Sequence, residues 1–116
     1  MNLEFKPLQK IGIVGGGQLA RMLALEAAPL GLEVHILSEK ETDPAAQVVR
    51  HWTSGDPNAS KDVLDFAKSL DYLTFESEFY EMTAYHQLAK STSVKIFPRP
   101  ACMEKLQSRD SQKQLL

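Results

Sequence analysis

Residues 15–20 have the types and spacing of a turn that binds an anionic ligand. They read Gly-Gly-Gly-Gln-Leu-Ala, which fits the nucleotide-binding form G-x-G-x-x-A, and they stand between a strand-like and a helix-like segment. Glycine allows a positive φ angle and lets a ligand approach the backbone with no Cβ in the way. The free N–H groups at a helix start carry partial positive charge, which suits anions. The segment therefore predicts a ligand-binding turn; a tight turn without a ligand is the open alternative.

Gln18 is the most informative side chain of this turn, because it can both donate and accept hydrogen bonds over the edge of a ligand. Arg21 follows one helical step later and could meet a substrate phosphate or form a surface ion pair. Glu39 stands near the end of the second predicted strand, where dinucleotide-binding folds place an acid for the ribose hydroxyls. An NAD(P)-binding domain is therefore a second open interpretation.

Two carboxylates form another candidate site. Glu76 and Glu78 have the same parity along a predicted strand, so their side chains leave one face, for acid–base chemistry or simply into water. His51 and His86 are not spaced as metal ligands with any cysteine or carboxylate, so the sequence predicts no metal site. Cys102 has no convincing base partner in the sequence and is interpreted as a structural thiol.

Alternating strand and helix patterns must position these residues. The predicted strands are β-branched or aromatic and cover residues 10–14, 33–37, 51–53, 72–75 and 94–97. The predicted helices cover residues 18–28, 44–49, 60–70, 82–91 and about 101–116. Asp43 and Ser60 are the predicted N-caps of the second and third helices. The apolar stripe of the first helix consists of Leu19, Met22, Leu23, Ala24, Leu25 and Ala27.

This alternation predicts a three-layer α/β domain, with a parallel sheet of about five strands and helices on both faces. Right-handed crossovers place the carboxyl ends of all strands at one edge of the sheet, and ligands bind there near the switch point of the strand order. Residues 15–19, 38–43 and 76–79 each follow a predicted strand. We therefore expect these three segments to meet at that edge.

Composition limits the remaining classes. The chain has 116 residues, 43% of them hydrophobic, which fits one globular domain. Its net charge of −2 argues against nucleic-acid binding, and no apolar run approaches the roughly 20 residues that a membrane span needs. The single cysteine cannot form an internal disulfide, so we expect a reducing, cytoplasmic location.

Several segments of the chain resemble one enzyme family. Residues 15–23 resemble the G-G-G-Q-L-G-R-M opening of the N5-carboxyaminoimidazole ribonucleotide synthetases. The other matches follow the family in order and lie at residues 27–32, 43–48, 55–56, 74–78, 98–100 and 108–113. The resemblance spans residues 10–116 and implies a Rossmann-like pre-ATP-grasp domain. It is more specific than the glycine pattern.

The resemblance implies a purine-biosynthetic ligase. ATP and bicarbonate would give carboxyphosphate, which carboxylates 5-aminoimidazole ribonucleotide, with Mg²⁺ on the phosphates. Site residues follow by position in the motifs. The substrate-binding residues implied in this way are Gly15, Gly16, Gly17, Gln18, Leu19 and Glu76; Arg109 is the implied contact to ATP.

The expected extent of the protein follows from the same resemblance. Residues 1–116 would form the N-terminal domain, and the chain ends without a helix stop signal, so we expect a truncated protein that lacks its ATP-grasp domains. ATP and Mg²⁺ would be bound mainly by those domains, and the fragment alone would be inactive. The family also implies a possible homodimer. Two further functions stay open, a formate-dependent glycinamide ribonucleotide transformylase, which Gln18 disfavours, and a pure interaction domain.

Overall fold

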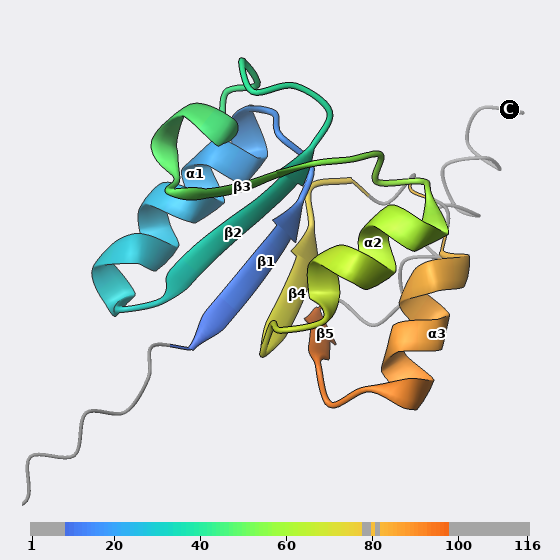
Figure 1. Cartoon of the computed structure of the whole chain (residues 1–116). Coiled ribbons are helices and arrows are strands. Elements are labelled where there is room, and N and C mark those ends of the chain that lie inside the picture. Colours follow the sequence, from blue (N-terminus) through green and yellow to red (C-terminus); the bar gives the residue numbers. More distant parts are fainter. Residues whose placement is uncertain (1–8, 78–79, 81, 98–116) are drawn as a thin grey trace, which may run out of the picture.

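Five parallel strands form one sheet in the computed structural model, which describes residues 9–77, 80 and 82–97. The strand order is β3-β2-β1-β4-β5, and neighbouring strands run parallel throughout (Figure 1). The strands are β1 (Lys10–Val14), β2 (Glu33–Ser38), β3 (His51–Ser54), β4 (Tyr72–Phe75) and β5 (Lys95–Phe97). The predicted parallel sheet is thus confirmed, and the strand order reverses between β1 and β4.

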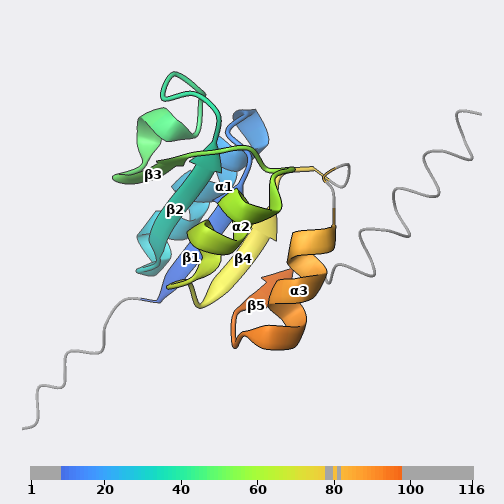
Figure 2. The same ribbon diagram turned by 45° about the vertical axis from the view of Figure 1, so that its right-hand side comes forward.

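Helices cover both faces of this sheet, which confirms the three predicted layers. Helix α1 packs on one face, and α2 and α3 pack side by side on the other (Figures 1 and 2). The helices are α1 (Gln18–Ala27), α2 (Ser60–Ala67) and α3 (Thr83–Ser91), with short 3-10 turns η1 (Ala28–Leu30) and η2 (Ala46–Val48). No helix within these described residues is long and apolar enough to cross a lipid bilayer.

Two predicted helix caps were wrong, although the predicted start of α2 at Ser60 is confirmed. Ser60 is the first residue of α2, and the extended residue Ala59 before it is the N-cap, without a side-chain capping bond. Asp43 does not cap a helix, because its Oδ2 instead accepts a hydrogen bond from the Lys40 N–H at 3.1 Å and closes a turn. Only the 3-10 turn η2 follows it. The predicted helix at about residues 101–116 lies outside the described residues.

The face under α2 and α3 has a core of large side chains. Tyr85 of α3 is fully buried, and its ring contacts that of Phe75 edge-on with centroids 4.4 Å apart. The Tyr85 hydroxyl donates a hydrogen bond to the Pro57 carbonyl at 3.0 Å. This pairing satisfies the one polar atom of the ring, so the aromatic side chain can fill the core without an unpaired group.

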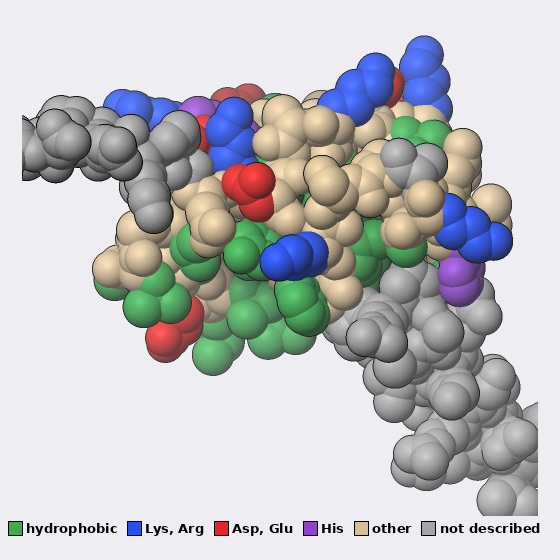
Figure 3. All heavy atoms as spheres, turned by 90° about the horizontal axis from the view of Figure 1, so that it is seen from below, with side chains coloured by type: hydrophobic (Ala, Val, Ile, Leu, Met, Phe, Trp, Pro, Cys, Tyr) green, Lys and Arg blue, Asp and Glu red, His purple; other side chains and the backbone are tan. Residues whose placement is uncertain are grey.

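The face under α1 is packed differently, and here the predicted stripe was partly wrong. The residues of α1 that are buried against the sheet are alanines: Ala20, Ala24 and Ala27. The large residues Leu19, Met22 and Leu25 are exposed, at 50%, 61% and 51%. Hydrophobic side chains are accordingly visible together on the surface seen from below (Figure 3). Small side chains let the axis of α1 approach the strands closely, and of its larger predicted stripe residues only Leu23 packs partly against this core.

Candidate functional site

The glycine turn lies at the carboxyl edge of the sheet, between the ends of β2 and β4. Gly15 follows β1 with a φ angle of 117°, a conformation that favours glycine. Its N–H donates to the Leu37 carbonyl at 2.8 Å, and the Gly16 carbonyl accepts from the Ala45 N–H at 2.9 Å. These bonds fix the turn to β2 and to the segment that follows it, and α1 begins directly after Gly17.

Glu76 holds the other side of the turn. Its backbone N–H donates to the Val14 carbonyl at 2.9 Å, which continues the pairing of β4 with β1. Its carboxylate accepts hydrogen bonds from the N–H groups of Gly17 at 3.0 Å and Ala20 at 3.4 Å. A negative charge therefore lies on the amino end of α1, where the helix dipole stabilises it.

The close packing of this turn explains its glycines. A Cβ on Gly17 would lie under 3.0 Å from the Glu76 carboxylate, and one on Gly16 would lie 2.7 Å from the Cβ atoms of Ser38 and Asp43. Side chains from both neighbouring loops thus occupy the space that any larger residue would need. The glycines therefore let neighbouring side chains pack directly against the backbone of the turn, and on one side the turn borders an open space.

That open space is a cavity of about 360 Å³ beside the turn. This volume is within the range of small-molecule sites, about 300–1,000 Å³. Its lining combines bare glycine backbone with charged and hydroxyl side chains: Gly15, Gly16, Ser38, Glu39, Lys40, Asp43, Pro57, Asn58 and Tyr80. The mixture offers a cation for a phosphate and carboxylates for hydroxyl or amino groups.

Tyr80 contributes a phenol to the lining of this cavity. Burial, reinforced by the negative charges of Glu76 and Glu39, raises the pKa of Tyr80 to about 12. A Cβ built on Gly15 would lie 2.6 Å from the Tyr80 hydroxyl oxygen, so that hydroxyl lies directly against the turn. At neutral pH the phenol is protonated, so it adds no negative charge to the carboxylates around the cavity.

The predicted site residues meet at this edge, but not all of them line the cavity. Gly15 and Gly16 line it, whereas Gly17 and Glu76 bond to each other beside it. Gln18 and Leu19 are exposed at the first turn of α1, outside the lining. Glu78, Arg109 and Cys102 lie outside the described residues.

Pro57, Asn58 and Tyr80 are the lining residues that the sequence did not place at this edge. The segment 38–43 was correctly expected at this edge, because it follows a strand that pairs in parallel with β1. Tyr80 had no such signal, since it belongs to a loop whose path back toward the glycine turn depends on tertiary packing.

Comparison with known proteins identifies chains of the same kind. A sequence profile described as the ribonucleotide synthetase preATP-grasp domain matches residues 8–107. The N5-carboxyaminoimidazole ribonucleotide synthase of Synechococcus elongatus is 36% identical over 114 residues, which cover 98% of this chain and 29% of that protein.

Solved structures of similar fold carry the same kind of name as the sequence relative. The N5-carboxyaminoimidazole ribonucleotide synthetase of Thermotoga maritima superposes with a TM-score of 0.83 at 33% identity, over 92% of this chain and 30% of the other. The N5-carboxyaminoimidazole synthase of Aspergillus clavatus, in complex with ADP and 5-aminoimidazole ribonucleotide, superposes with a TM-score of 0.81 at 32% identity. That match covers 92% of this chain and 28% of the other.

Proposed function

The chain belongs to the ribonucleotide synthetase preATP-grasp domain family, and on that premise we propose that it binds the ribonucleotide substrate of an ATP-dependent carboxylating ligase. The substrate would be 5-aminoimidazole ribonucleotide and the product its N5-carboxy derivative, in purine biosynthesis. The chain spans only 29% of the length of the Synechococcus elongatus relative and 31% of the length of its Brucella melitensis counterpart. Carboxylation is therefore proposed for the whole protein, with residues 1–116 as its N-terminal domain.

One observation carries the proposal: the amino end of α1, Glu76 and an open cavity meet at the switch point of the sheet. Glu76 is already held by the Gly17 and Ala20 N–H groups, so its carboxylate has a defined position from which to accept a hydrogen bond from a ligand. Gly15 and Gly16 line the cavity with no side chain in the way, and Lys40 adds a positive charge. These groups suit a ligand with a phosphate, hydroxyls and an amine.

The proposed reaction has two steps. A bicarbonate oxygen attacks the γ-phosphorus of ATP, which gives carboxyphosphate and ADP. The exocyclic amine of the ribonucleotide then attacks the carboxyl carbon, so an N–C bond forms, the C–O bond to phosphate breaks, and inorganic phosphate leaves with the proton that the amine nitrogen loses. In this scheme Gly15, Gly16, Gly17, Gln18, Leu19 and Glu76 position the ribonucleotide for the second step.

We assign ATP and Mg²⁺ mainly to parts of the protein beyond this chain. Mg²⁺ prefers oxygen ligands in octahedral geometry. Among the described residues, the one grouping of three metal-ligating side chains contains two histidines, a poor match for Mg²⁺. Arg109 is the proposed contribution of this chain to ATP, because a guanidinium binds phosphate oxygens in a bidentate way.

We also propose a cytoplasmic homodimer. A single cysteine and the need for intracellular ATP support the location. The exposed Met22 and Leu25 of α1 support a protein contact on that helix. Sedimentation of the full-length protein tests the dimer, with Met22→Glu expected to shift it toward monomer; an unchanged dimer would remove α1 from the interface.

The decisive experiment measures release of ADP by the full-length protein in the presence of 5-aminoimidazole ribonucleotide and bicarbonate. Glu76→Gln should raise the KM for the ribonucleotide about 10- to 100-fold, as expected for a hydrogen bond to a charged group. Gln18→Ala should raise it about 2- to 10-fold. Glu26→Gln on α1 and Gln87→Ala on α3 are the matched controls. Equal kinetics for Glu76→Gln and its control would contradict the proposed role.

A dinucleotide-binding domain is the second candidate, because Glu39 lines the cavity just after β2, where such folds place an acid for the ribose. Fluorescence titration with NADH and NADPH separates the two functions. We expect no tight nicotinamide binding by the chain. We also expect no ATP hydrolysis by residues 1–116 alone. Steady ATP turnover by this fragment would refute the assignment of ATP binding mainly to parts of the protein beyond this chain.

A further inference from the structure

A group of three potential metal ligands lies away from the glycine turn, in the amino-terminal half of β2 and β3. The parallel register places His35 of β2 next to His51 of β3 as Cα partners. Glu33 precedes His35 by two residues, so all three side chains leave the same face of the sheet. The sequence spacing hides this group, because strand pairing alone brings residue 51 beside residues 33 and 35.

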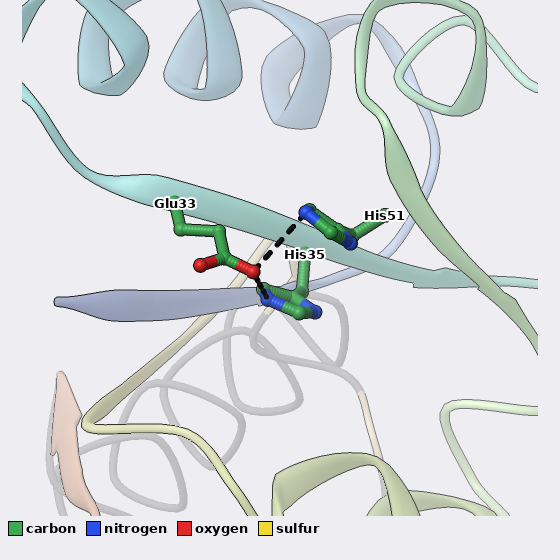
Figure 4. Close-up of side chains that lie close together, drawn as sticks. All are labelled: Glu33, His35 and His51. Carbon is green, nitrogen blue, oxygen red and sulfur yellow. Dashed lines mark hydrogen bonds and ion pairs between the residues drawn. The ribbon is translucent and has the colours of Figure 1, made fainter. Parts of the chain in front are cut away.

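The three side chains converge on one point (Figure 4). The Nε2 atoms of His35 and His51 each lie 3.1 Å from the same oxygen, Oε1 of Glu33. The two imidazole rings stack with centroids 4.5 Å apart and an angle of 15° between their planes. One ligand atom from each residue lies within 4.8 Å of the others.

These separations suit a metal ion. Metal–ligand bonds of about 2.0–2.1 Å in a tetrahedral zinc site put neighbouring ligand atoms about 3.3 Å apart, close to the 3.1 Å observed here. Rotation about the soft terminal torsion of each histidine turns its ring lone pair toward a shared ion. The group therefore needs side-chain adjustment only, with the strands left in place.

The surroundings allow an ion to enter and water to complete its coordination. The side chains of His35, Glu33 and His51 are 17%, 25% and 40% exposed. Burial lowers the pKa of His35, and the neighbouring charges of His51 and Lys10 lower it further, against the hydrogen bond that its ring makes to Glu33 and against the Glu33 charge. Lys10 is the Cα partner of Glu33 on the same face, and its charge opposes a cation.

We propose that Glu33, His35 and His51 form a binding site for a divalent transition-metal ion of the zinc class. Two imidazole nitrogens and one carboxylate oxygen are ligands that Zn²⁺, Co²⁺, Ni²⁺ and Cu²⁺ accept readily. On metal binding, the Nε2 atom of each histidine gives up its hydrogen bond to Glu33 and donates its lone pair to the ion, while the ring proton resides on Nδ1. The site is independent of the proposed ligase function.

The test uses the full chain without a histidine tag, titrated with Zn²⁺ alone and with Co²⁺ alone. We expect one ion per chain by calorimetry, and visible d–d absorption from bound Co²⁺. Imidazole ¹⁵N resonances should shift for His35 and His51 on addition of Zn²⁺, and stay in place for His86. His86 of α3 is the third histidine of the chain and the matched control.

Variants then assign the ligands. His35→Gln and His51→Gln should each weaken Zn²⁺ binding by at least about tenfold, since even second-shell changes cost 10- to 100-fold. His86→Gln should leave the affinity unchanged. If His35→Gln fails to fold, the more exposed His51→Gln still decides the question. Unshifted His35 and His51 resonances at millimolar Zn²⁺, or equal affinity in all three variants, would overturn the site in favour of a purely hydrogen-bonded cluster.

Discussion

The two faces of the sheet are packed by different rules. The face under α2 and α3 is filled by large side chains such as Tyr85, Phe66 and Phe75. The face under α1 is filled on the helix side mainly by Ala20, Ala24 and Ala27, while Leu19, Met22 and Leu25 of that helix are exposed. One face is therefore stabilised by the burial of large apolar side chains, whereas on the other the small side chains allow α1 to pack close to the strands.

That short distance is what the candidate site requires. Glu76 shares strand parity with Thr74 and so lies on the face of α1, where its carboxylate reaches the N–H groups of Gly17 and Ala20. A helix raised by larger side chains would lift these donors away from Glu76. The comparison teaches that one face stabilises the domain, whereas the other positions the amino end of α1 over the ends of the strands.

The largest effect is expected on the face with large side chains. Tyr85→Ala should lower the free energy of unfolding by about 3–5 kcal/mol, because it removes a fully buried aromatic ring. Tyr85→Phe, the matched control, loses only the hydrogen bond to the Pro57 carbonyl and should cost about 1 kcal/mol. Urea denaturation of the chain measures both. Equal losses in the two variants would mean that this face does not depend on apolar volume.

A smaller effect is expected on the alanine face. Ala24→Leu should lower the free energy of unfolding by about 1–3 kcal/mol, because Ala24 is only 3% exposed and the added atoms must push α1 outward. The same change should also weaken ribonucleotide binding in the full-length protein. Leu25→Ala, next to it on the exposed side, should stay within about 0.5 kcal/mol of the original. A harmless Ala24→Leu would disprove the close-packing argument.

The link between the two faces can be tested at Glu76. Glu76→Gln in the chain alone should lower the free energy of unfolding by about 1 kcal/mol, because a negative charge at the amino end of α1 is lost. Glu26→Gln, near the other end of α1, is the control and should not destabilise the helix. Added salt should reduce the difference between Glu76→Gln and the original chain. If Glu76→Gln left the free energy of unfolding unchanged, Glu76 would have no role in stabilising α1 and could act only toward the ligand.

Most of the fold followed from the sequence, because the pattern of each element agreed with its final place. The β-branched run at residues 10–14 and the glycines after it predicted a strand and a turn that the structure places as expected. The stripe of α1 was misjudged for a physical reason. Hydrophobicity favours burying leucine, but the spacing between α1 and the sheet decides which residues fit, and no local pattern records that spacing.

The sequence predicted where the site lies in the fold, but it did not predict several of the contacts within it. Parallel order brought Gly15 and Glu76 to the same edge, as the alternation of strands and helices implied. Tyr80 against Gly15, and His51 beside His35, depend on loop paths and strand register that a single sequence does not specify. Pairs of residues that are far apart in sequence and joined only by tertiary packing are the part that sequence reasoning could not reach.

Tyr80 offers the smallest effect and the sharpest test of how the faces meet, since it packs against the core of α2 and α3 and also lies near Glu76. Burial raises its pKa from 10.0 to about 12. The folded protein holds the phenol proton more tightly than the unfolded chain, so this contribution to stability is present below pH 10 and is lost as pH rises toward 12. Tyr85, whose pKa is also raised by burial, adds a loss of the same sign to every variant.

Tyr80→Phe should therefore lose less stability than the original chain across that window, measured by urea denaturation at matched ionic strength. Parallel losses in the two proteins would mean that the Tyr80 hydroxyl is not enclosed between the faces.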